Sequence, residues 1–234
     1  MIGHRGCGGT KFSNTIEAFL KAAQLGAEMI EFDVRRSQDG VLIVHHDSDV
    51  FGSFVSENSC ADLKRIALAE GLVLSTLEET LIALRGKVQL DVELKESGYE
   101  KDVVNLVLKY FSTSEFIMKS FHDESVLAIK KSFPDVSAGL LIGTNDELTF
   151  DAHVKSLRKL KRKYHEIFPW KRVKNCRADF ISPDRRLLFL GMLRSAARRR
   201  IPVLVWTVND RRTMVALRKT GLVSGIITDL PETK

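Results

Sequence analysis

The chain has 234 residues, of which 44% are hydrophobic and 28% charged, with a formal net charge of +6. This balance is that of a folded globular domain and excludes a largely disordered chain, and no apolar run reaches the roughly 20 residues that a membrane-spanning helix needs. The three cysteines are odd in number and lack C-x-x-C spacing, which argues against a disulfide framework or a structural zinc site and favours a cytoplasmic protein.

Short apolar runs alternate with segments of helical periodicity along the whole chain. The first run covers residues 1–4. It precedes a helix predicted over 14–26, for which Asn14 is the expected N-cap and Gly26 the stop.

The second apolar run, residues 28–34, is interrupted by Glu31 and Asp33. Residues two apart on a strand point to the same side, so both carboxylates should face the same way. The turn signal "SQDG" then returns the chain through a third run, 41–46, which ends in His46. We therefore expect two carboxylates and an imidazole to meet here.

An inserted loop and short helix are expected over residues 48–75, after which strands and helices alternate again. Further strands are predicted over 88–94, 115–121, 137–143, 178–184, 202–208 and 224–229, and further helices over 76–86, 99–111, 123–133, 155–168, 187–200 and 211–221. Such alternation is typical of a parallel sheet with helical crossovers. If the two runs around "SQDG" form one bent unit, the sequence contains eight strands. We therefore predict a single α/β domain over 1–234, a TIM (β/α)8 barrel with a small insertion after its second strand.

A doubly wound open sheet is the alternative fold. It would carry a G-x-G-x-x-G phosphate turn after an early strand. The segment "RGCGG", residues 5–9, is Gly-rich but lacks that spacing. The barrel is therefore the better prediction.

Polar and ionisable residues gather at the carboxyl ends of the predicted strands, where TIM barrels carry their active sites. They are His4, Arg5, Glu31, Asp33, His46, Asp47, Glu93, Lys95, Ser120, His122, Trp206, Asn209 and Asp229. Each one alone is more often a structural contact, but burying the whole set unpaired would cost roughly several kcal/mol per ion. Three carboxylates without cysteine suit a hard divalent cation, Mg²⁺ or Ca²⁺.

Seven motifs follow one another along nearly the whole chain: "HRG", "NTIEAF", "GAEMIEFDVRRSQDGVLIVHHD", "ELK", "SFH", "VWTVN" and "GIITDLP". Together they closely resemble the glycerophosphodiester phosphodiesterases. The resemblance implies a TIM barrel, one divalent metal ion and a phosphoric diester hydrolase of lipid and glycerol metabolism. Such an enzyme cleaves glycerophosphodiesters to an alcohol and sn-glycerol 3-phosphate.

Carried over residue by residue, the resemblance also implies a role for each strand-end residue. The metal ligands would be Glu31, Asp33 and Glu93; the general acid–base pair His4 and His46; the phosphate-binding residues Arg5 and Lys95; and the candidate substrate-pocket residues His122 and Trp206. His45 is expected to face away from His46. The family usually has Glu immediately before the Asn-Thr pair, where this chain has Ser13, so substrate orientation or metal affinity is expected to differ.

Two other functions stay open at this point. The first keeps the same site but takes a lysophospholipid, in the manner of a lysophospholipase D, and it requires an apolar groove built from 48–75 with Phe51 and Phe54. The second is a catalytically weak barrel that binds a phosphate ligand or nucleic acid. The sequence has little of the aromatic–basic interleaving that nucleic-acid binding uses, so no nucleic-acid partner is expected.

Residues 155–174 carry nine Lys or Arg against one Glu, and one face of the predicted helix is apolar, with Leu157, Leu160, Tyr164 and Ile167. An ordinary crossover helix accounts for this pattern. The alternative is a weak contact with anionic membranes, aided by Phe168 and Trp170. No pattern in the sequence indicates the oligomeric state.

Overall fold

The computed structural model describes residues 1–9, 12–143 and 168–231. Eight parallel strands form a barrel wall: β1 (Ile2–His4), β2 (Met29–Arg36), β6 (Gln89–Leu94), β7 (Phe116–Ser120), β8 (Ser137–Ile142), β9 (Phe180–Pro183), β10 (Leu204–Val205) and β11 (Gly225–Thr228). They are paired in the order β10-β11-β1-β2-β6-β7-β8-β9. Isolated parallel bridges, Ile181–Val203 and Asp184–Trp206, join β9 to β10 and complete the ring. The predicted TIM barrel is confirmed.

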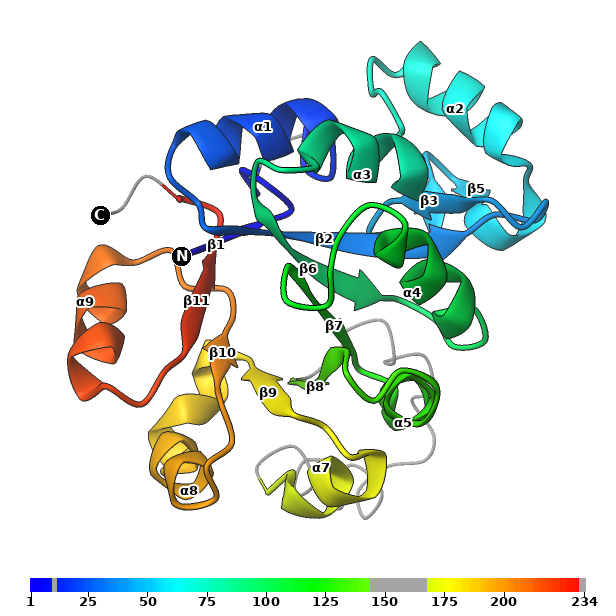
Figure 1. Ribbon diagram of the computed structural model, residues 1–234. Helices are drawn as coiled ribbons and strands as arrows, with labels where there is room; N and C mark the ends of the chain where they lie inside the picture. The colour runs from blue at the N-terminus through cyan, green and yellow to red at the C-terminus, as the bar shows by residue number, and fades with distance from the viewer. Residues whose placement is uncertain (10–11, 144–167, 232–234) are drawn as a thin grey trace, which may run out of the picture.

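Helices surround the barrel wall (Figure 1). The helices in the described part of the chain are α1 (Ile16–Gln24), α2 (Cys60–Ala69), α3 (Leu77–Leu84), α4 (Glu100–Leu108), α5 (Asp123–Ser132), α7 (Trp170–Cys176), α8 (Met192–Arg198) and α9 (Arg211–Thr220), with short 3₁₀ turns η1 (Val55–Glu57) and η3 (Arg185–Leu190). All of these α-helices except α2 belong to the ring around the barrel. The apolar residues of β2 that alternate with its carboxylates pack against these helices. For example, the ring of Phe32 lies 5.6 Å, centroid to centroid, from that of Phe19 on α1.

The start of α1 differs from the prediction by one residue. Thr15 is the N-cap, and its side-chain oxygen accepts a hydrogen bond of 3.2 Å from the Ala18 N–H. Asn14 instead has a left-handed backbone, with φ 62°, and its buried side chain binds Asp33. Asn tolerates this conformation better than most residues, so the side chain expected to cap the helix is used in the site.

A separate apolar cluster lies inside the barrel, on the side of the strand amino ends. It consists of Ile2, Phe180, Leu204 and Ile227. Gly139 makes room for it, because a Cβ atom there would lie 2.1 Å from the Phe180 ring.

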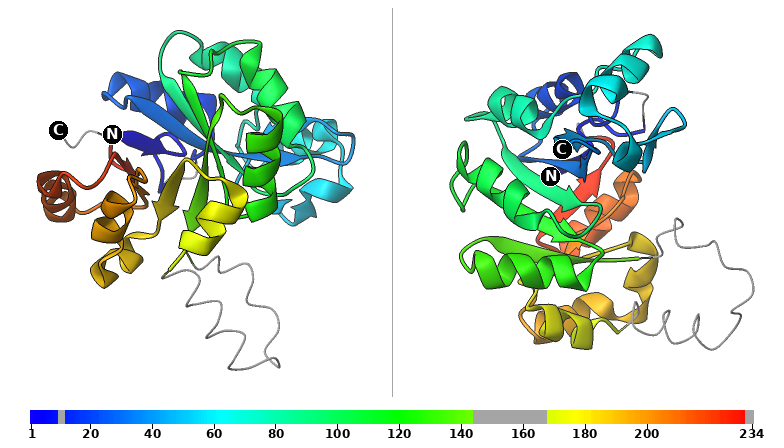
Figure 2. Two further views of the ribbon diagram at one scale, coloured as in Figure 1. Left: turned by 60° about the horizontal axis from the view of Figure 1, so that its bottom comes forward. Right: turned by 90° about the vertical axis from the view of Figure 1, so that its right-hand side faces the viewer.

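The segment after β2 folds against the outside of the barrel. Strand β3 (Leu42–Val44) pairs antiparallel with β2, and β4 (Asp49–Val50) with β5 (Ser53–Phe54) forms a small hairpin followed by η1 and α2. Its own small core is made of Ile43, Val50, Val55, Cys60, Leu63, Ala67 and Leu74. Figure 2 shows α2 lying apart from the ring of barrel helices. Phe51 and Phe54 are 56% and 51% exposed.

Most of the basic segment 155–174 lies outside the described residues, which resume at Phe168. Phe168 is 46% exposed. Trp170 begins α7, and its ring is covered by the guanidinium carbon of Arg199 at 4.5 Å from the ring centroid. Trp170 is therefore engaged within the protein.

Candidate active site and metal centre

A small cavity of about 60 Å³ opens at the carboxyl ends of the strands. It is lined by His4, Arg5, Glu31, His46, Glu93, Lys95, Lys119, Phe121, Leu141, Trp206 and Ile227. Most of the residues that the sequence suggested for the site thus meet at one barrel mouth. This convergence follows from the parallel strands, whose carboxyl ends all lie at the same end of the barrel.

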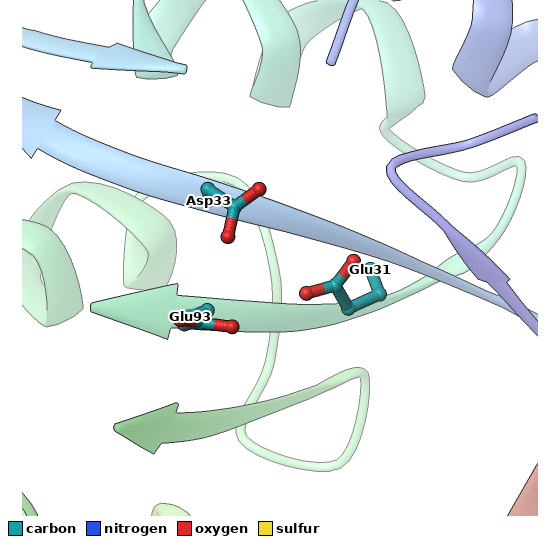
Figure 3. Close-up of side chains that lie close together, drawn as sticks. All are labelled: Glu31, Asp33 and Glu93. Carbon is teal, nitrogen blue, oxygen red and sulfur yellow. The ribbon is translucent and has the colours of Figure 1, made fainter. Parts of the chain in front are cut away.

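Three buried carboxylates on two adjacent strands form the centre of the site (Figure 3). Glu31 and Asp33 of β2 and Glu93 of β6 each offer an oxygen, and these oxygens lie within 4.8 Å of one another. Asp33 is directly opposite Glu93 in the strand register. The Oδ1 atom of Asp33 accepts no hydrogen bond from any described residue. Hard oxygen donors with an open lone pair fit a divalent cation of the Mg²⁺ or Ca²⁺ type.

Asp33 is held as a carboxylate by its surroundings. Burial alone would raise its pKa, but the positive charges of Lys95, Arg5 and His46 and a hydrogen bond from Asn14 together hold the pKa well below its usual range. Lys95 Nζ lies 3.5 Å from Oδ1, and Arg5 Nε lies 3.2 Å from Oδ2. The Asn14 amide donates to Oδ2 at 2.8 Å. The carboxylate is therefore available as a ligand at neutral pH.

The loop after β1 brings Arg5 to the carboxylates through a tight turn. Arg5 and Gly6 have φ values of 50° and 81°, and the Arg5 backbone N–H donates to Glu31 Oε2 at 2.9 Å. At Gly8 an added Cβ would lie 1.9 Å from Asp229 Oδ1, so only glycine fits there. The Gly-rich "RGCGG" thus allows close packing on a carboxylate.

His4 is paired with an aspartate from the far end of the chain. Its Nδ1 lies 2.6 Å from Asp229 Oδ1, and its Nε2 lies 4.0 Å from Glu31 Oε2. Asn209 donates to the other Asp229 oxygen at 2.6 Å. Burial would raise the pKa of Asp229, but the hydrogen bonds and charge of His4 and the Asn209 amide keep it below its usual value. The aspartate therefore orients His4 with Nε2 toward the carboxylates.

The two adjacent histidines have different surroundings. His46 lines the cavity, and its Nδ1 lies 2.7 Å from Asp47 Oδ1. His45 is not among the lining residues; its Nε2 is 2.9 Å from the Asp49 carbonyl oxygen, and burial lowers its pKa. Arg35 Nε donates to the His46 carbonyl oxygen at 2.8 Å and fixes this segment. In the structure, His46 therefore lies at the cavity and His45 lies outside it.

The two candidate substrate-pocket residues have different positions. Trp206 lines the cavity, where its ring packs edge-on against Phe121, and its Nε1–H donates to the Ser182 carbonyl oxygen at 2.7 Å. His122 is not one of the lining residues, and its Nε2 lies 3.2 Å from the Lys95 carbonyl oxygen. Ser13 is half-buried and brings no charge to the edge of the site.

Sequence reasoning missed Asp91 and Lys119, which are fully buried beside the carboxylates. Lys119 Nζ lies 2.8 Å from Asp91 Oδ2 and 3.3 Å from Glu31 Oε1. Complete burial raises the pKa of Asp91 to about 7 although Lys119 opposes the shift. Burial would lower the pKa of Lys119, but the surrounding carboxylates raise it, so the ammonium keeps its charge. The signal was present, since each residue interrupts an apolar strand.

Comparison with known proteins agrees with this geometry. Residues 4–233 match the model of the glycerophosphoryl diester phosphodiesterase family. The chain belongs to this family. Members of the family are phosphoric diester hydrolases, so the resemblance and the enzyme class expected from the sequence motifs are confirmed.

The similarity of this family member to known relatives extends over almost the whole chain. A glycerophosphodiester phosphodiesterase of Caldanaerobacter subterraneus is 27% identical over 251 residues, which cover 100% of this chain and 95% of that protein. The crystal structure of a glycerophosphodiester phosphodiesterase from Thermotoga maritima is 25% identical, with a TM-score of 0.71 and coverage of 99% and 94%. An Oleispira antarctica phosphodiesterase, in complex with the product sn-glycerol-3-phosphate, is 19% identical, with a TM-score of 0.78 and coverage of 99% and 93%. At 19% identity, the similarity to the Oleispira antarctica structure shows a shared fold.

No helix in the described ranges is both long enough and apolar enough to cross a membrane.

Proposed function

We propose that this protein hydrolyses glycerophosphodiesters to an alcohol and sn-glycerol 3-phosphate, using a bound divalent metal ion and two histidines. The observation that carries the proposal is the convergence of three kinds of group at one cavity: a carboxylate triad, two imidazoles each paired through Nδ1 with an aspartate, and cationic side chains. The Oleispira antarctica relative holds sn-glycerol-3-phosphate as its product, which supports this substrate class.

The metal ion would be held by Glu31, Asp33 and Glu93. When bound, Mg²⁺ or Ca²⁺ would act as a Lewis acid on the phosphate and offset the charge that develops on its oxygens. The charge of the site favours this assignment. With the charge of Lys119 offset by its partner Asp91, the three carboxylates outnumber the remaining cations Arg5 and Lys95 by one, so a dication and a singly charged diester together bring these groups to neutrality.

Arg5 and Lys95 would bind the non-bridging oxygens of the phosphate. Burial would lower the pKa of Lys95, but Glu93 and Asp33 raise it, so its ammonium stays charged. Lys95 Nζ lies 2.9 Å from Glu93 Oε1, which fixes it at the cavity wall. The Arg5 side chain is 26% exposed and can reach a substrate from the mouth. Preorganised cations of this kind stabilise a transition state better than mobile ones.

His4 and His46 would carry the protons. Because Asp229 and Asp47 bind the Nδ1 atoms, each ring keeps Nε2 for exchange with the substrate. One ring would take the proton of the attacking oxygen, and the other would give a proton to the leaving alkoxide.

The alternative lysophospholipid substrate finds less support. It requires an apolar groove near Phe51 and Phe54, but most of the residues around the hollow beside Phe54 are polar or charged in type. Its volume is about 490 Å³, and it is lined by Arg36, Ser37, Gln38, Gly40, Ser48, Phe54, Val55, Ser56, Glu96, Ser97 and Tyr99. Hydroxyl, amide and charged groups suit a small polar alcohol better than an acyl chain. A catalytically weak binding barrel is also disfavoured, because Ser13 is the one departure from the family motif that we identify.

A coupled assay for glycerol 3-phosphate, with and without EDTA, tests the proposal. The wild type should release glycerol 3-phosphate from glycerophosphocholine and lose this activity in EDTA, with recovery on adding Mg²⁺ or Ca²⁺. Glu31→Gln, Asp33→Asn and Glu93→Gln should each abolish both activity and metal binding in calorimetry. Glu115→Gln is the matched control, because Glu115 lies before β7, at the opposite end of the barrel. Unchanged activity in EDTA, or a preference for lysophosphatidylcholine, would contradict the proposal.

A further inference from the structure

Asp91 and Lys119 form a buried ion pair to which the proposed reaction assigns no role. Lys119 Nζ is shared between Asp91 Oδ2 at 2.8 Å and the metal-ligand candidate Glu31, whose Oε1 is 3.3 Å away. All three side chains are at most 2% exposed. The other Asp91 oxygen, Oδ1, accepts no hydrogen bond from the part of the chain that the structure describes. One buried ammonium thus contacts both a carboxylate ligand and a carboxylate outside the triad.

The strand register explains why these groups meet. Asp91 is directly opposite Glu31 on the neighbouring strand, and Lys119 is directly opposite Glu93. The Lys119 side chain therefore starts level with Glu93 and reaches back toward the pair of carboxylates one layer deeper. Residues of one register layer point to the same side of the sheet. The pair is consequently built into the wall directly beside the triad.

We propose that this pair sets the metal affinity of the site. Lys119 holds the Glu31 carboxylate in place and opposes a bound cation, both by its charge and by engaging Oε1. Asp91 counteracts Lys119, because it draws the ammonium away from Glu31 and offsets its charge. Both act through Glu31 and are positioning residues. This inference rests on the proposed function, since it requires that Glu31 bind a metal ion.

An ordinary structural ion pair would behave differently. If Asp91 and Lys119 only stabilised the barrel, removing either partner would loosen the site and weaken metal binding in the same direction. The proposed role instead requires opposite effects. Without Asp91, Lys119 should settle on Glu31 and weaken metal binding, and without Lys119, Glu31 should be freed and bind the metal more tightly.

The test is calorimetric titration of Mg²⁺ and of Ca²⁺ into the full chain and three variants. Asp91→Asn should raise the Kd about tenfold, the lower end of what partners of metal ligands contribute. Lys119→Met should lower the Kd. The double variant should bind at least as tightly as the wild type, and therefore at least about tenfold more tightly than Asp91→Asn alone. Glu115→Gln should leave the Kd unchanged.

The double variant keeps the test decisive if Lys119→Met alone does not fold. Replacing both members of a buried ion pair is far better tolerated than leaving one charge unpaired. A double variant that binds as weakly as Asp91→Asn would overturn the inference, as would shifts of the same sign in both single variants. If the wild type binds neither ion, the proposed function fails and this inference with it, whereas normal wild-type binding with same-sign shifts refutes this inference alone.

Discussion

The adjacent residues His45 and His46 allow a matched test of the site, because only one of them lines the cavity. His46→Ala removes an imidazole that lines the cavity and is hydrogen-bonded to Asp47, whose side chain is 66% exposed. A pair this exposed contributes about 0–1 kcal/mol to folding. Loss of general acid–base catalysis, by contrast, lowers turnover by about 10²–10⁴-fold, which corresponds to roughly 2.7–5.4 kcal/mol of transition-state stabilisation.

His45→Ala should show the reverse pattern. It removes a partly buried hydrogen bond to the Asp49 carbonyl oxygen, 2.9 Å long, and leaves that acceptor without its partner. The expected cost is about 1–3 kcal/mol of folding free energy, with turnover unchanged within about threefold because the ring is outside the cavity. Turnover is measured by the coupled glycerol 3-phosphate assay and stability by urea unfolding. If His45→Ala loses turnover and His46→Ala keeps it, the assignment of the returning segment is wrong.

Four further outcomes are expected. Asp229→Asn should lower kcat about 10–100-fold in steady-state assays, because it weakens a charge-assisted hydrogen bond to His4 worth about 1.5–3 kcal/mol; unchanged kcat would remove the orienting role. Burial lowers the pKa of His45, so its contribution to stability is complete above its unfolded pKa of about 6.5 and is lost as the pH falls below it. In urea unfolding between about pH 5 and pH 8, His45→Gln should flatten this dependence, and an unchanged slope would contradict it. Ser13→Glu should be tolerated and should tighten metal binding or raise activity, whereas a large loss would show that the site is arranged around the serine. Through residues 155–174 the protein should co-sediment with anionic vesicles at low salt but not at high salt, and not with neutral vesicles; equal binding to both would leave this segment an ordinary crossover helix.

The sequence by itself determined the alternation of strands and helices and the side of the sheet on which Glu31 and Asp33 lie. Both follow from local chemistry, since side chains alternate along a strand whatever its partner is. The same rule applied to Asp91 and Lys119 would have placed them in the barrel interior as well. Ordered motifs then carried the family resemblance and with it the expected role of Glu93 as a metal ligand.

Tertiary structure alone decided which of these groups touch. Asp229 lies 225 residues from His4 in the chain, and barrel closure brings them together. The pairing of Lys119 with Asp91 depends on the register of two neighbouring strands, which no local pattern specifies. Asn14 donates a hydrogen bond to Asp33, because the left-handed turn at Asn14 directs its amide to the buried carboxylate. Thr15 caps the helix instead. A sequence states which groups are available for chemistry, whereas distances between them depend on contacts between residues far apart in the chain.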